Sequence, residues 1–104
     1  MADQMIDKEA HEYELVYILQ ADMPEDAVLA VNDRVGQIVG NNSGQISQTE
    51  MWGRRTLAYP IKKQFEGHYV LHRLSMFPEG TDEVERYLRF NEEVLRFLMM
   101  RTDS

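Results

Sequence analysis

The feature that most restricts the possible folds of this chain is a pair of long strand-like segments, residues 45–61 and 68–76. β-Branched and aromatic residues favour a strand in both segments, and Gly53 inside the first indicates a β-bulge. Pro60 cannot donate a ladder hydrogen bond, so it belongs on an edge strand or at a strand end. We expect a turn over residues 62–67 and a hairpin that displays its charged residues at one edge of a sheet.

The segments that flank this hairpin alternate in type. Residues 11–19 and 94–100 are rich in apolar and aromatic residues and predict strands. Apolar residues at helical spacing predict helices over residues 24–39 and 81–90, the first of which ends at Gly40. The order β-α-β-β-α-β predicts an α+β, ferredoxin-like sandwich, in which a four-stranded antiparallel sheet carries both helices on one face. The nearly continuous apolar character of the last strand predicts burial on both of its faces.

Length and composition indicate one small intracellular domain. The chain has 104 residues and no cysteine, so it is the size of a single domain and folds without disulfides. We expect residues 1–10 to form a flexible acidic arm, residues 11–102 a single ferredoxin-like domain, and residues 103–104 a C-terminal end. The acidic N-terminus and the absence of a long apolar segment predict a cytoplasmic protein with neither a secretion signal nor a membrane span.

Charge is distributed unevenly along the chain, whose net charge is −7. Residues 1–51 hold ten acidic and two basic residues, whereas residues 52–73 hold five basic residues and one acidic residue. An acidic protein is a poor general nucleic-acid binder, but a local basic patch with interleaved aromatic residues permits specific RNA binding. A solvated charged surface is the alternative interpretation. The residues of this patch are Trp52, Arg54, Arg55, Tyr59, Lys62, Lys63, Phe65, His68, Tyr69 and Arg73.

A second expected surface is the face of the sheet that the two helices leave uncovered. Strand alternation places six apolar residues from three strands on this face, and a patch of this kind is typical of a protein-binding surface. A register error of one residue would instead move them into the core. The six residues are Val16, Ile18, Tyr69, Leu71, Leu98 and Met100.

The sequence contains no recognisable catalytic, metal-binding or cofactor-binding pattern. The glycines at Gly40 and Gly44 follow a predicted helix, whereas a phosphate-binding loop precedes one. His68 and His72 lie on a predicted strand, without the helical spacing of a zinc protease, so structural roles are the favoured interpretation. We therefore expect no enzymatic activity, no cofactor, no metal and no small-molecule substrate.

Four motifs resemble the bacterial small-subunit ribosomal protein six family over about residues 13–101. They are residues 13–19 (YELVYIL), 52–63 (WGRRTLAYPIKK), 66–71 (EGHYVL) and 91–98 (NEEVLRFL). The second motif is highly specific, and all four occur in the family's order. The resemblance implies a ferredoxin-like fold and a structural role in the small ribosomal subunit. It also implies binding to the central domain of small-subunit ribosomal RNA as a heterodimer with small-subunit ribosomal protein eighteen, a small basic protein.

The resemblance further implies which residues contact RNA. The family's Trp-Gly-Lys/Arg-Arg pattern corresponds to residues 52–55. For Trp52 and Tyr59 we expect packing instead of base stacking, because both lie inside a strand. The expected phosphate contacts are Arg54, Arg55, Lys62 and Lys63, with Arg96 and Arg101 as weaker candidates at a sheet end.

Two other functions remain open from the residues alone. An RNA recognition module would stack single-stranded bases on its sheet, but residues 66–71 match the aromatic signature of such modules poorly, because Glu66 replaces the leading basic residue. A small enzyme or metabolite-sensing domain could use the same fold. It would need a convergent polar cleft, which the sequence does not indicate.

Overall fold

The computed structural model describes residues 9–103, so the expected acidic arm lies outside the described residues except for Glu9 and Ala10. Neither helix in this part of the chain is long and apolar enough to cross a membrane. The elements in chain order are β1 (His11–Gln20), α1 (Glu25–Asn41), β2 (Gln45–Ile61), β3 (Gln64–Met76), a 3₁₀ turn (Pro78–Gly80), α2 (Thr81–Phe90) and β4 (Val94–Arg101).

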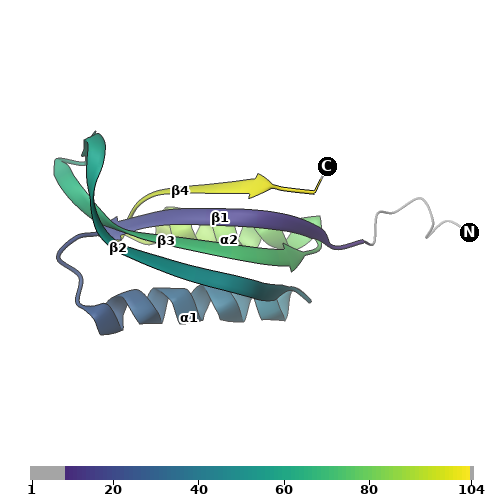
Figure 1. The fold of residues 1–104 in the computed structure, drawn as a ribbon. Helices are drawn as coiled ribbons and strands as arrows, with labels where there is room; N and C mark the ends of the chain where they lie inside the picture. Colours follow the sequence, from purple (N-terminus) through teal and green to yellow (C-terminus); the bar gives the residue numbers. More distant parts are fainter. Residues whose placement is uncertain (1–8, 104) are drawn as a thin grey trace, which may run out of the picture.

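The four strands form one antiparallel sheet in the order β2-β3-β1-β4, with both helices packed on one side (Figure 1). This arrangement confirms the predicted ferredoxin-like fold and the edge position of β2. Leu15, Tyr17 and Leu19 on β1 face the helices and are fully buried, as strand alternation predicts. We call the opposite side of the sheet the open face.

Each helix buries one apolar stripe against the sheet. In α1 the stripe is spaced at three and four residues, and in α2 it consists of Val84 and Leu88. Helix α1 ends at Asn41, one residue past the predicted stop at Gly40, because the turn that ends the helix is formed by Ser43 and Gly44. Ser43 adopts a left-handed φ of 61°, and the Gly44 amide donates to the Val39 carbonyl at 2.8 Å. The buried residues of α1 are Val28, Val31, Val35, Ile38 and Val39.

The β2–β3 hairpin is tighter at its end than the sequence predicts. The predicted turn over residues 62–67 is longer than the observed one. Strand β3 begins at Gln64, so only Lys62 and Lys63 lie between the strands. Both lysines have left-handed backbones, with φ of 51° and 65°, where Asn-Gly is the usual pair. Gly53, with φ of 77°, lies at a register shift, which confirms the predicted bulge.

The distal part of this hairpin, residues 54–66, folds over one end of the open face, and we call it the hairpin arm. Thr56 pairs with Glu66 and Ile61 with Gln64, so β2 bulges outward between the two pairs. Leu57 in this bulge is buried against Ile18 and Leu95. Figure 1 shows the end of the hairpin curving away from α1 beyond the sheet.

The prediction that the last strand is buried on both faces is wrong. Val94, Phe97 and Met99 pack toward the helices. On the open face, however, Leu98 is 56% exposed and Met100 is 45% exposed. The helices cover only one side of β4, and the hairpin arm covers the open face only near the beginning of that strand.

Candidate binding surfaces

The two arginines of the hairpin arm are held in place by neighbouring residues. The Arg54 guanidinium forms an ion pair with Glu66 at 2.9 Å, across the two strands. The Arg55 guanidinium lies 5.6 Å from the ring centre of Trp52, and its Nε donates to the Trp52 carbonyl at 3.3 Å. Glu66 therefore compensates the charge of Arg54, whereas the charge of Arg55 remains available over an aromatic ring.

Trp52 is the centre of a short stack at the base of the arm. Its ring lies parallel to that of Tyr69, with centroids 6.1 Å apart and an interplanar angle of 12°. The Trp52 indole N–H donates to a Glu50 carboxylate oxygen at 2.9 Å. Trp52 therefore packs against Tyr69 and Arg55 while its side chain remains 40% exposed, and packing in place of base stacking stays a prediction for this residue.

The corresponding expectation for Tyr59 is wrong. Its side chain is 61% exposed, and its hydroxyl accepts a hydrogen bond from Arg96 Nη1 at 3.3 Å. The bulge removes Tyr59 from the regular ladder, and this part of β2 extends beyond the sheet, so lying inside a strand does not bury it. Phe65 on the other strand of the arm is 69% exposed.

The six basic residues expected to bind RNA do not form one cluster. Four belong to the hairpin arm, and Arg96 joins them through its hydrogen bond to Tyr59. Arg101 lies at the opposite end of β4, where its Nε contacts an Asp103 carboxylate oxygen at 2.9 Å. Among the described residues, Lys62 and Lys63 have no ion-pair partner, so the turn presents two uncompensated positive charges.

The six apolar residues expected on the open face lie on that face but differ in exposure. Ile18 lies under Leu57 of the arm, and Leu71 is also buried. Val16 and Tyr69 are half-buried. The accessible apolar surface therefore consists mainly of Leu98 and Met100 on β4, with Val16 of β1 beside Leu98.

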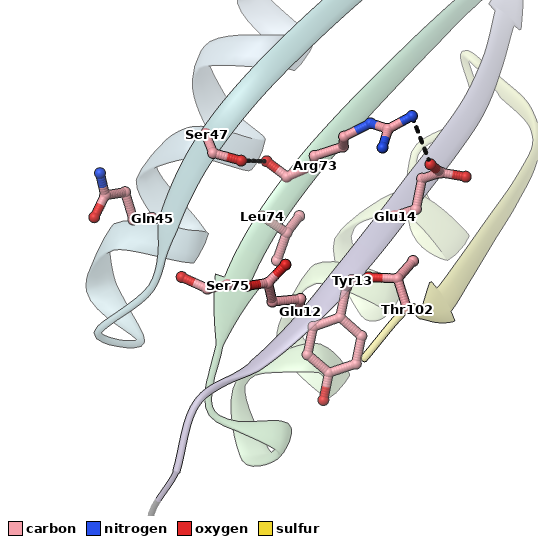
Figure 2. Close-up of a pocket in the computed structure, with 9 residues that line it drawn as sticks. All are labelled: Glu12, Tyr13, Glu14, Gln45, Ser47, Arg73, Leu74, Ser75 and Thr102. Carbon is pink, nitrogen blue, oxygen red and sulfur yellow. Dashed lines mark hydrogen bonds and ion pairs between the residues drawn. The ribbon is translucent and has the colours of Figure 1, made fainter. Parts of the chain in front are cut away.

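At the end of the sheet opposite the arm, the open face carries a polar pocket (Figure 2). The Glu14 carboxylate pairs with the Arg73 guanidinium at 3.2 Å, which accounts for one cation of the basic segment. The Ser47 hydroxyl donates to the Arg73 carbonyl at 3.1 Å. The two opposite charges at the centre of this pocket, on Glu14 and Arg73, are thus already paired with each other.

A buried hydrogen-bond chain runs through the core and was missed by sequence reasoning. The Tyr17 hydroxyl donates to Asn32 Oδ1 on α1 and lies 2.8 Å from His72 Nε2. His72 Nδ1 lies 2.8 Å from Thr49 Oγ1 on β2. Because the Tyr17 hydroxyl proton is engaged by Asn32, we assign the Nε2–H tautomer to His72. Burial lowers the pKa of His72 to about 4 and raises that of Tyr17.

Comparison with known proteins identifies the family. The family model described as "Ribosomal protein S6" matches residues 12–101. The chain belongs to the ribosomal protein S6 family. The matched segment contains the whole hairpin arm and nearly the entire sheet, so the S6 assignment includes both surfaces described above.

Individual S6 relatives agree with this assignment. A protein named small ribosomal subunit protein bS6 from Granulibacter bethesdensis is 45% identical over 92 residues, which are 88% of this chain and 60% of the relative. The bS6 protein of Caldanaerobacter subterraneus is 38% identical over 88% of this chain and 97% of its own length. The crystal structure of 30S ribosomal protein S6 from Thermotoga maritima has a TM-score of 0.85 and 28% identity, covering 90% of this chain and 89% of that one.

The S6 family is a family of ribosomal proteins and not of enzymes, which confirms the predicted absence of enzymatic activity. The four motifs that suggested the resemblance are therefore correctly assigned. The matched segment spans only 60% of the length of the Granulibacter protein, whereas it spans 97% of the Caldanaerobacter protein.

Proposed function

We propose that this chain is a cytoplasmic structural component of the small ribosomal subunit. In this proposal the hairpin arm binds small-subunit ribosomal RNA, and the open face binds small-subunit ribosomal protein eighteen as a heterodimer. Membership of the S6 family supports the proposal, as do the names of the relatives. The observation that carries the RNA-binding part is the hairpin arm, which concentrates exposed positive charge in a chain of net charge −7.

Lys62 and Lys63 are the leading candidates for phosphate contact. Both side chains are free of ion pairs within the described structure, and both occupy left-handed backbone positions. A left-handed backbone at a residue with a side chain lowers the free energy of unfolding by about 1 kcal/mol or more. The folded protein would therefore be more stable with glycine or asparagine at these positions. The two lysines therefore reduce the stability of the fold, and strained backbone positions of this kind are common at functional sites. This observation supports a role of the turn in binding.

The four arginines are expected to contribute to RNA binding to different extents. Arg55, braced by Trp52, adds a second cation at the base of the arm. Arg54 must exchange its Glu66 ion pair for a phosphate, so its net contribution is smaller. Arg96 is close enough to extend the same surface, whereas Arg101 at the far end of β4 can contact RNA only in a separate segment.

The open face supports a protein partner of positive charge. Leu98 and Met100 expose apolar surface next to β1, and Glu14 lies between Met100 and Arg73 in the sheet register. Residues 1–51, which include this strand, carry ten acidic and only two basic residues. A basic partner would neutralise this charge and supply additional contacts to RNA.

The RNA-binding part is tested by replacing the turn with its preferred residues, Lys62→Asn with Lys63→Gly. Relief of backbone strain should raise the free energy of unfolding by about 1 kcal/mol. Loss of two phosphate contacts should weaken RNA binding and flatten the plot of log affinity against log salt by about 1.4–1.8. Urea denaturation and filter binding at several salt concentrations measure the two effects.

The matched control removes two positive charges from the helical side of the protein, Arg34→Gln with Arg86→Gln. Both arginines line the groove between α1 and α2, away from the arm. The control should keep the original salt dependence. If the turn variant binds RNA with unchanged affinity and salt dependence, the lysines are not part of an RNA interface.

A further inference from the structure

Two exposed aromatic rings flank the lysine turn at the end of the hairpin arm. Tyr59 precedes the turn on β2 and is 61% exposed, and Phe65 follows it on β3 and is 69% exposed. Both are large rings left in water on a projecting segment. The apolar neighbours Leu57 and Ile61 instead pack toward Ile18. The arm thus separates its side chains into an inward aliphatic set and an outward aromatic set.

The outward rings are surrounded by positive charge. Lys62 and Lys63 lie between them in sequence, and Arg96 donates to the Tyr59 hydroxyl at 3.3 Å. This hydrogen bond places the Tyr59 hydroxyl beside a guanidinium. Exposed rings with cations beside them suit RNA, because unpaired bases stack on aromatic side chains and the adjoining phosphates bind lysine and arginine.

We propose that Tyr59 and Phe65 stack on unpaired bases of RNA whose neighbouring phosphates are bound by Lys62 and Lys63. This inference rests on the proposed RNA binding and specifies its chemistry: single-stranded nucleotides at the arm, with no sequence readout by hydrogen bonds. The aromatic face accepts any base, because every base has a π-surface. The stacking site is the projecting arm and not the face of the sheet used by RNA recognition modules.

The test distinguishes the contribution of base stacking to RNA affinity from that of the positive charges. The probe is a transcript of the central domain of small-subunit ribosomal RNA, bound by the full chain together with the partner protein. The variants Phe65→Leu and Tyr59→Leu keep an apolar side chain but remove the ring. Each should weaken binding roughly 5- to 100-fold, with an unchanged salt dependence, because the phosphate contacts remain. Phe65→Trp should retain binding.

Phe90→Leu is the matched control, because Phe90 is 76% exposed at the end of α2, on the side of the molecule that carries the helices. It should bind the transcript as the unsubstituted chain does. Chemical probing of the transcript should show unpaired bases that are protected by the unsubstituted chain and exposed with Phe65→Leu.

Three results would overturn the inference. Phe65→Leu and Tyr59→Leu could both bind the transcript as tightly as Phe90→Leu, which would leave the lysine contacts and the proposed function intact. They could instead weaken association with the partner protein without RNA, which would assign the rings to a protein interface. If the unsubstituted chain with its partner fails to bind the transcript, both the inference and the RNA-binding function are wrong.

Discussion

At the scale of single residues, His72 shows how the core of this protein depends on a neutral histidine. Its side chain is almost completely buried, and both ring nitrogens have hydroxyl partners, from Tyr17 and Thr49. Protonation would place a positive charge in the core and remove the acceptor that Thr49 uses. The native state therefore holds His72 neutral and binds fewer protons at this site than the unfolded chain.

The consequence is a loss of stability in acid. Burial lowers the pKa of His72 from 6.5 to about 4, so this contribution is fully present above pH 6.5 and is lost as the pH falls toward 4. Over this range the free energy of unfolding should fall by on the order of 3 kcal/mol. In urea titrations, His72→Gln should remove this part of the decline, whereas His68→Gln should keep it. Equal declines in both variants would exclude His72 as the cause.

At the scale of elements, the hairpin arm depends on a satellite core that is separate from the main one. Leu57, Ile18 and Leu95 form this cluster, and Gly67 makes room for it, since a Cβ there would lie 2.3 Å from an Ile18 methyl group. The arm can therefore loosen without disturbing the packing between sheet and helices.

Truncation of Leu57 tests this separation. Leu57→Ala should lower the free energy of unfolding by about 2–3 kcal/mol, because a buried side chain leaves a cavity. It should also speed amide hydrogen exchange in residues 54–66 more than in α1 or β1. Leu29→Ala, at a 44% exposed position on α1, should change both quantities little. Uniform acceleration across the domain would show that the arm is not an independent unit.

The elements were predictable from the sequence to the extent that local patterns define them. Helix α2 has the predicted bounds, and the assignment of strand faces was correct, because periodicity reports local burial. The curvature of the arm and the exposure of Tyr59 were not predictable. They depend on Leu57 packing against residues about forty positions away in either direction, and on two lysines adopting a backbone conformation that sequence patterns assign to Asn-Gly.

At the scale of the whole molecule, the two candidate surfaces adjoin but do not coincide. The arm covers Ile18 at one end of the open face and leaves Leu98 and Met100 accessible toward the other. A partner on β4 and RNA on the arm could therefore be bound together, and Arg96 at the start of β4 lies between them. This arrangement supports cooperative assembly of protein and RNA.

Disruption of the open face should separate the two functions. Leu98→Asp with Met100→Asp adds negative charge to exposed apolar positions and should weaken heterodimer formation at least tenfold, measured by calorimetry. Leu29→Asp on α1 is the matched control and should leave association unchanged. Since both substituted residues lie on β4 and outside the cluster that holds the arm, the RNA affinity of the chain alone should fall far less than heterodimer formation does. Normal heterodimer formation by the double variant would place the partner elsewhere.

Joint assembly is tested most directly by the RNA affinity of this chain and its partner, measured separately and together on one transcript of the central domain. We expect weak binding by this acidic chain alone and binding by the mixture at least tenfold tighter than by either protein. Lys62→Asn with Lys63→Gly should lower the affinity of the mixture. Equal affinity for the mixture and for the partner alone would contradict the proposed joint assembly.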